Sequence, residues 1–166
     1  MKNIVLIGMP GCGKSAIGEI LAEKIEMTFI DIDTYIEAST NLTITEIFKN
    51  GEAAFRDIES LAIDKLSEKT SVIISTGGGV IKKQKNILNL KKKGVIIYIN
   101  RPIENIVTDI NVEGRPLLAK DPAKLSRLFD ERGPLYKRYC DYEIMNIRGV
   151  DDVVNSIIEI YKKINR

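Results

Sequence analysis

The sequence predicts an α/β domain in which a parallel β-sheet is covered by helices on both faces. Short apolar runs rich in β-branched residues recur along the chain, and segments with helical spacing of apolar residues lie between them. Runs that are mostly apolar rather than alternating are typical of strands buried on both faces. Because strands that alternate with helices favour a parallel sheet, and because 166 residues are the size of one domain, we expect a single parallel-sheet domain.

Five segments are predicted strands because each is short, mostly apolar and contains β-branched residues. In chain order they are NIVLIG (3–8), FIDI (29–32), SVIIST (71–76), VIIYIN (95–100) and DYEIM (141–145). Four segments are predicted helices because their apolar residues have helical spacing, and the second begins with the capping box TITE and ends at Asn50-Gly51. These helices lie at 15–25, 43–50, 52–68 and 151–164. One side of the third is expected to carry Ala54, Phe55, Ile58, Leu61, Ala62 and Leu66.

The composition excludes several classes of protein. The 25 basic and 23 acidic residues give a net charge of +2, so charge predicts no binding to nucleic acid or to a membrane. The chain has no histidine, so a general base must be Asp, Glu, Lys or Tyr. The two cysteines, Cys12 and Cys140, provide neither a disulfide framework nor metal-ligand spacing. Without a signal-peptide pattern or a membrane-spanning apolar run, we expect a cytoplasmic location.

The segment GMPGCGKS (8–15) matches the phosphate-binding pattern G-x-x-x-x-G-K-[ST]. It follows a predicted strand and opens a predicted helix, which favours a phosphate cradle over a plain glycine-rich turn. Lys14 would bridge the β- and γ-phosphates of a nucleotide, and the Ser15 hydroxyl would bind Mg²⁺. The predicted ATP-binding residues here are Gly11, Cys12, Gly13, Lys14, Ser15 and Ala16.

Two carboxylates, Asp31 and Asp33, lie two positions apart in FIDIDTYIE (29–37), where strand geometry would put them on one face at a cost in desolvation. Phosphate-binding loops usually work with an acidic residue at the end of another core strand, and the strand at 71–76 ends without one. We therefore expect Asp31 to face Mg²⁺ through its waters and Asp33 to accept a proton from a substrate hydroxyl. The alternative is a helix cap, for which Asp33 is the natural choice.

Three glycines and three arginines are the remaining candidates. Gly77 to Gly79 end a predicted strand, which suggests that something bulky approaches their backbone. Arg56 and Glu59 are one helical turn apart, which by itself indicates a surface ion pair. Arg115 lies in a segment rich in Gly and Pro at 111–122, which is either a surface loop or a lid. Arg132 precedes a Gly-Pro pair that is predicted to break a helix.

Taken together, GMPGCGKS, DID, GEAAFRDIE, TGGG, RPLL and ERGPLY, in this order and spacing, resemble the shikimate kinase family over nearly the whole chain. The resemblance implies a single P-loop kinase domain, 1–166, with a five-stranded parallel sheet of order 2-3-1-4-5. It also implies a shikimate-binding helical segment at about 33–60 and a mobile lid at about 111–123. The implied reaction moves the γ-phosphate of ATP to the 3-hydroxyl of shikimate, with one Mg²⁺ per subunit, in a monomer that serves chorismate and aromatic amino-acid biosynthesis.

The resemblance also implies residue roles. Catalysis would rest on Lys14, Asp33 and Arg115, and the metal would be held by Ser15 and Asp31. Arginine suits a carboxylate because its planar guanidinium makes two parallel hydrogen bonds, and Glu59 would orient one such guanidinium. Shikimate would be bound by Asp33, Arg56, Gly77, Gly78, Gly79 and Arg132.

The chain departs from the family at the adenine site. Where members often carry an arginine that stacks on adenine, this chain has Thr108, so we expect Arg148 to contact adenine or the contact to be weaker. Two rival functions remain open at this point. One is a related small-molecule kinase, such as a gluconate kinase, and the other is a nucleotide-binding module without catalysis. A nucleoside monophosphate kinase is less favoured because no segment resembles DG[FY]PR.

Overall fold

The computed structural model describes residues 2–112 and 121–165 of the chain. A five-stranded sheet forms its centre, with the order β2-β3-β1-β4-β5, as the family resemblance implied. All four pairings between neighbouring strands are parallel, which confirms the predicted sheet type. The strands are β1 (Asn3–Ile7), β2 (Thr28–Asp31), β3 (Val72–Ser75), β4 (Gly94–Asn100) and β5 (Tyr142–Met145).

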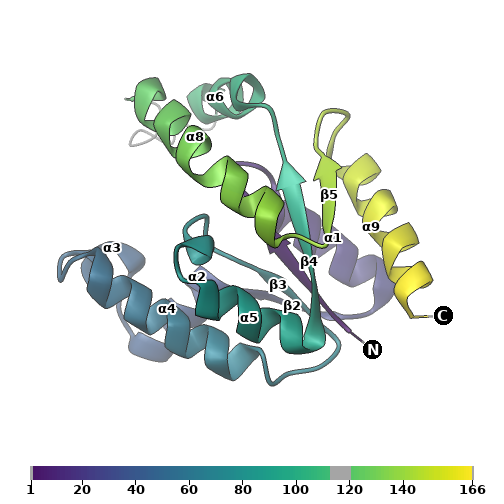
Figure 1. Ribbon diagram of the computed structural model, residues 1–166, viewed down its shortest axis with the longest axis horizontal. Helices are drawn as coiled ribbons and strands as arrows, with labels where there is room; N and C mark the ends of the chain where they lie inside the picture. Colours follow the sequence, from purple (N-terminus) through teal and green to yellow (C-terminus); the bar gives the residue numbers. More distant parts are fainter. Residues whose placement is uncertain (1, 113–120, 166) are drawn as a thin grey trace.

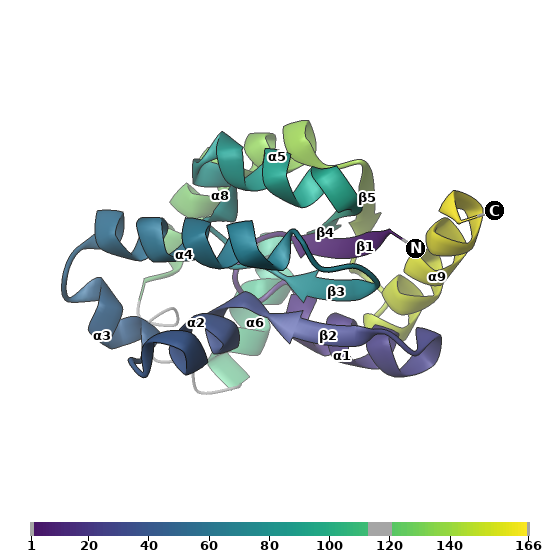
Figure 2. The same ribbon diagram turned by 90° about the horizontal axis from the view of Figure 1, so that it is seen from below.

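Helices cover both faces of the sheet, and both termini lie near the same end of the molecule (Figure 1). Figure 2 shows α4, α5 and α8 on one side of the sheet and α1 on the other, where α1 packs against α9. The four helices predicted with bounds are present, and the described residues form four further ones. No bounds were predicted for these four, although a cap at Asp33 and a break at Gly133-Pro134 implied a helix at each of those two places. The helices are α1 (Lys14–Ile25), α2 (Ile32–Thr40), α3 (Ile44–Phe48), α4 (Glu52–Leu66), α5 (Gln84–Lys93), α6 (Ile103–Val112), α8 (Pro122–Tyr139) and α9 (Val150–Ile164), with a 3₁₀ turn at Val80–Lys82.

The hydrophobic core surrounds the three inner strands. Every residue of β1, β3 and β4 is buried, whereas β2 and β5 are partly exposed. The expectation that all five strands are buried on both faces is therefore wrong for β2 and β5. The reason is position, because these two strands form the edges of the sheet, where only one neighbour covers each of them.

The capping box of α3 is confirmed, since Thr43 and Glu46 bond each other's backbone N–H groups. The predicted apolar side of α4 is partly wrong. Leu61 is 63% exposed, whereas Arg56 and Glu59 are buried beside Phe55. The buried side of α4 therefore carries two charged side chains, Arg56 and Glu59, in addition to apolar ones.

The predicted helix break at Gly133-Pro134 is wrong, because α8 continues through both residues to Tyr139. Pro134 removes one helical hydrogen bond. Leu125 and Tyr136 lie on the two sides of it and are both buried. Because α8 packs on both α6 and β4, with Tyr136 stacked on Tyr98 of β4, tertiary contacts hold the helix together across Pro134.

The predicted lid at 111–123 begins within α6 and ends within α8, and its middle, with Arg115, lies outside the described residues. The helices that the structure describes include none with the length and apolar character needed to span a bilayer.

Candidate active site

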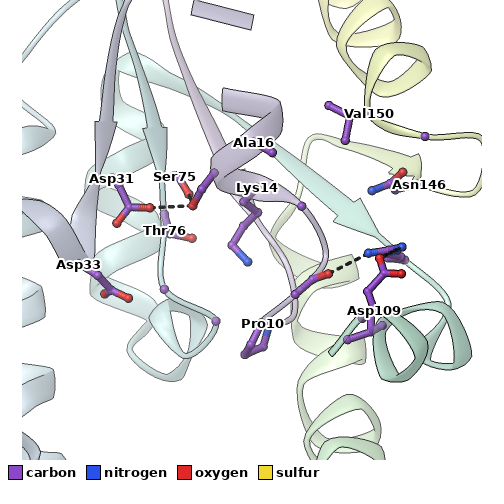
Figure 3. A pocket seen from close by; sticks show the side chains of 18 residues that line it. Pro10, Lys14, Ala16, Asp31, Asp33, Ser75, Thr76, Asp109, Asn146 and Val150 are labelled. Atoms are coloured by element: carbon purple, nitrogen blue, oxygen red, sulfur yellow. Dashed lines mark hydrogen bonds and ion pairs between the residues drawn. The ribbon is translucent and has the colours of Figure 1, made fainter. Parts of the chain in front are cut away.

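A cavity of about 480 Å³ lies at the carboxyl ends of the strands. The loop at 8–15 forms its middle, the ends of β2 and β3 form one side, and the segments after β4 and β5 form the other. Figure 3 shows Asp31 and Asp33 on one side of Lys14, with Asp109, Asn146 and Val150 on the other. Of the predicted residues, the cavity brings together Gly11, Gly13, Lys14, Ser15, Ala16, Asp31, Asp33, Gly77 and Gly78.

The loop at 8–15 has the geometry of a phosphate cradle. The backbone angles φ of Gly8, Gly11 and Gly13 are 149°, 79° and 101°, values that residues other than glycine rarely adopt. Lys14 is 8% exposed, and its Nζ donates to the carbonyl oxygens of Gly8 at 2.8 Å and Met9 at 2.9 Å. An ammonium group and a helix N-terminus thus meet at one point, which favours binding of an anion.

Cys12 differs from its neighbours in this loop because it is fully buried and does not line the cavity. Its Sγ lies 3.5 Å from the Nζ of Lys14. A contact with the nucleotide through the side chain of Cys12 is therefore not indicated, and its predicted role in ATP binding rests on its backbone.

Asp31 and Ser15 form a pair of adjacent oxygen donors. The Oγ of Ser15 donates to Oδ2 of Asp31 at 2.9 Å, and the other carboxylate oxygen accepts from the backbone N–H of Thr34 at 3.2 Å. Asp31, and not Asp33, is thus the cap of α2. The strand ends at Asp31 and the helix begins with Ile32, so the two carboxylates do not share one face of a strand.

The pair fits Mg²⁺, which prefers oxygen ligands and keeps several waters. Residues 2–112 and 121–165 contain no cluster of three or more acidic, cysteine or histidine side chains that could hold a metal alone. Phosphate oxygens and water would therefore complete the coordination.

Asp33 lies in the first turn of α2 and points into the cavity (Figure 3). Burial raises the pKa of its carboxyl group above the ordinary value of 3.8, and the charge of Asp31 adds to this, while Lys14 opposes it. A carboxylate with a raised pKa is a stronger base, which is what acceptance of a hydroxyl proton requires.

Arg56 and Glu59 form a buried ion pair, so their interpretation as a surface pair is wrong. Nη1 of Arg56 donates to Oε1 of Glu59 at 2.9 Å, and Glu59 is completely buried. Burial raises the pKa of the Glu59 carboxyl, and the charge of Arg56 opposes this rise. Glu52 also bonds Arg56, at 3.3 Å, so the guanidinium is held from two sides.

The three glycines after β3 leave room for charged side chains. A methyl group on Gly79 would lie 2.5 Å from Cζ of Arg56, and one on Gly78 would lie 3.2 Å from Nη1 of Arg132. On Gly77 it would lie 3.2 Å from Oε2 of Glu59. The bulky groups predicted to approach this backbone thus include two guanidinium groups of the protein itself.

Three buried polar atoms around this turn have no hydrogen-bond partner within the described part of the chain: Oδ1 of Asp33, Oε2 of Glu59 and Nε of Arg132. We call them the open polar atoms. Buried polar groups are almost always hydrogen-bonded. Two acceptors and one donor gathered at one turn therefore indicate a ligand with groups of both kinds.

We expect Gly79→Ala to raise the KM for the acceptor substrate by about tenfold, because the new methyl group displaces the Arg56 guanidinium from its place beside Glu59. The backbone of Gly79, with φ of −96°, suits alanine, so the effect reports the side-chain clash. Steady-state kinetics measures it. Gly133→Ala is the control, because a methyl group there meets no described atom within 4 Å. An unchanged KM in Gly79→Ala would contradict the assignment.

Three contributing side chains were missed by the sequence analysis. The hydroxyl of Tyr136 donates to the Gly78 carbonyl and so ties the glycine turn to α8. Arg101 and Asn146 bond the loop at 8–15. A usable signal existed for Arg101 and Asn146, since each directly follows a predicted strand at its carboxyl end, where ligands bind in α/β sheets.

The predicted adenine contact of Arg148 stays a prediction. Its side chain is exposed and lines a separate hollow beside Asp152 and Glu159. The side of the main cavity across Lys14 from Asp33 is lined instead by residues of α6, of the β5–α9 connection and of the start of α9: Ile106, Asp109, Asn146, Gly149 and Val150 (Figure 3). Thr108 lies on α6, where its hydroxyl donates to the carbonyl of Glu104.

Residues 10–162 match the model of the shikimate kinase family. The chain is 47% identical to a shikimate kinase of Clostridium beijerinckii over 161 residues, which cover 96% of this chain and 95% of the relative. It is 48% identical to a shikimate kinase of Clostridium botulinum, with 96% and 98% covered. Among solved structures, a shikimate kinase from Acinetobacter baumannii in complex with shikimate matches with a TM-score of 0.90 and 33% identity, over 98% of this chain and 94% of that one.

Proposed function

The chain belongs to the shikimate kinase family, and we propose that its cavity binds ATP and shikimate side by side and transfers the γ-phosphoryl group to the 3-hydroxyl of shikimate. Shikimate is a small ring that carries one carboxylate and three hydroxyls. The product would enter the synthesis of chorismate and the aromatic amino acids. Shikimate kinase activity itself follows from the identity of 47% over nearly the full length of a curated relative.

The observation that carries the choice of acceptor is the set of open polar atoms at the glycine turn. Arg132 offers a buried donor to a carboxylate, and the guanidinium of Arg56 lies at the same turn. Asp33 offers a buried acceptor to a hydroxyl group. A compact hydroxy acid supplies the complementary groups, which an uncharged sugar does not.

The nucleotide would lie along the loop at 8–15, with Lys14 at its terminal phosphates. Ser15 and Asp31 would hold one Mg²⁺, which when bound neutralises charge on the phosphates. A monomeric state and a single metal ion per subunit are parts of the same proposal. Arg115, outside the described residues, keeps its proposed role of neutralising charge during transfer.

In the proposed step, Asp33 accepts the proton of the acceptor hydroxyl as its oxygen bonds to the γ-phosphorus. The bond from that phosphorus to the bridging oxygen breaks, and ADP leaves. Arg56 and Arg132 fix the carboxylate and thereby the distance of the reacting hydroxyl from phosphorus. Lys14 stabilises charge that develops on the transferring group.

Coupled ADP release from the purified protein with Mg-ATP tests this function. We expect turnover with shikimate, and little with gluconate or without an acceptor. Both acids carry a carboxylate and hydroxyls, but the ring of shikimate fixes their relative positions, whereas the open chain of gluconate must be ordered on binding. Turnover with gluconate instead would favour the related small-molecule kinase. Nucleotide binding without turnover on either acid would favour a module without catalysis.

A further inference from the structure

Two successive carbonyl groups of the phosphate loop accept hydrogen bonds from side chains outside the loop. Nη1 of Arg101 donates to the carbonyl oxygen of Gly11 at 3.2 Å. Nδ2 of Asn146 donates to the carbonyl oxygen of Cys12 at 3.0 Å. The donors come from different parts of the chain, since Arg101 follows β4 and Asn146 follows β5. Two strand ends thus hold two neighbouring peptide groups of one loop.

Both donors are themselves fixed. The guanidinium of Arg101 forms an ion pair with Asp109 on α6, which lies on the same side of the loop as Asn146 (Figure 3). Asn146 is 6% exposed, and its backbone N–H donates to the carbonyl of Asn100 at 2.8 Å. A donor that is held in place loses little further entropy when it bonds the loop.

The bonds fix the direction of the loop's N–H groups. A peptide group is planar, and its N–H points opposite to its C=O. With the Cys12 carbonyl bonded to Asn146, the N–H of Gly13 points away from Asn146. The peptide after Gly11 is held at both ends, because the Cys12 N–H donates to the Met9 carbonyl at 3.2 Å while Arg101 bonds its oxygen.

Such anchors matter because Gly11 and Gly13 both have positive φ. Glycine adopts many other backbone conformations as readily as this one, so the residues themselves do not fix the loop. A free loop would populate several peptide orientations, and each phosphate contact would then cost ordering entropy. The anchored peptide after Cys12 presents the Gly13 N–H before the nucleotide arrives, while the anchored peptide after Gly11, whose N–H bonds the Met9 carbonyl, holds the shape of the loop.

We propose that Arg101 and Asn146 are positioning residues that pre-organise the phosphate loop for the polyphosphate part of the nucleotide. Through Asp109, Arg101 also ties this loop to α6. The proposal rests on the nucleotide-binding half of the proposed function and is independent of the acceptor. It predicts that the two residues affect binding of the phosphates whatever base is attached.

The alternative is direct contact with the base, because Arg101 lines the cavity together with Ile106 and Val150. A guanidinium over an aromatic base would act on the base alone. Inorganic pyrophosphate separates the two roles because it has phosphates and no base.

The experiment compares Arg101→Met, Asn146→Ala and the double variant with the wild-type protein. Calorimetry gives the Kd for Mg-ADP, and competition against ATP gives the inhibition constant of Mg-pyrophosphate. We expect each single variant to weaken both ligands by a similar factor of about ten, as loss of a hydrogen bond to a charged or buried partner does. The KM for shikimate at saturating ATP should stay within about twofold. The double variant should lose less than the product of the single losses, since both residues hold one loop.

Arg138→Met is the matched control, because Arg138 is an exposed arginine of α8 that does not line the cavity. Asp109→Asn keeps Arg101 and loosens its anchor, so it should give a smaller loss for both ligands and remains informative if Arg101→Met folds poorly. A loss for Mg-ADP without a loss for pyrophosphate would overturn the proposal in favour of base contact. Unchanged affinities for both would overturn it outright. A wild-type protein that binds no nucleotide would instead overturn the proposed function.

Discussion

Asp33→Asn is expected to lower kcat with shikimate by about 10²–10⁴-fold, because an amide cannot accept the hydroxyl proton. The Kd for Mg-ADP should change by no more than about threefold, since Asp33 lies on the acceptor side of Lys14 and makes no bond to the loop at 8–15 among the described residues (Figure 3). Steady-state kinetics and calorimetry measure the two quantities. Asp57→Asn on the exposed side of α4 is the control.

The pH dependence gives an independent test of the same role. The active form of Asp33 is the carboxylate, so kcat/KM for shikimate should rise with pH as this group loses its proton. Because burial raises its pKa above 3.8, the rise should lie above the ordinary range of aspartate. Asp33→Asn should remove this limb of the profile. Equal losses of kcat and nucleotide affinity, or a limb unchanged in the variant, would exclude Asp33 as the base.

The five strands and four of the described helices were predictable because their signals are local, whereas the order of the strands in the sheet came from the family resemblance. An apolar run, a capping box such as Thr43 with Glu46, and a glycine pattern around Lys14 each act within a few residues. The helix through Pro134 was not predictable in this way. Its continuation depends on the burial of Tyr136, whose hydroxyl bonds Gly78, 58 positions away in the chain.

The site was predictable in its residue types and not in its contacts. The family resemblance identified Arg56 and Glu59 as site residues, whereas their spacing alone indicates an exposed ion pair. Their burial was not predictable, because it depends on which elements cover α4. The contacts of Arg101 and Asn146 were missed because their partners lie 90 and 134 positions away and are backbone carbonyls. The position of each residue directly after a predicted strand was the only signal that the sequence offered. Asp31 rather than Asp33 became the cap because the strand ends at Asp31, one residue earlier than its apolar pattern indicated.

Arg56→Met and Arg132→Met are both expected to lower kcat/KM for shikimate by on the order of 10²-fold or more, because each removes a buried cation that we propose to bind the substrate carboxylate. Their effects on stability should differ. Arg56 is paired with the completely buried Glu59 at 2.9 Å, whereas Nε of Arg132 is one of the open polar atoms. Kinetics and thermal unfolding without ligand measure the two properties.

Arg56→Met should destabilise the protein by about 2–3 kcal/mol, because it leaves the Glu59 carboxyl buried without its cation. This lies below the usual cost of breaking a buried pair, since Glu59, with its raised pKa, can take up a proton. Arg132→Met should leave Tm unchanged or raise it, because it replaces a buried, incompletely bonded cation by an apolar side chain.

The double variant Arg56→Met/Glu59→Gln separates the two functions of Arg56. A neutral amide is less costly to bury than a carboxylate, so the double variant should regain part of the lost Tm while kcat/KM for shikimate stays low. Recovery of kcat/KM together with Tm would mean that Arg56 acts only through folding, and the site would then need another partner for the carboxylate. Recovery of Tm alone means that the buried pair holds in place a guanidinium whose charge is used by the substrate.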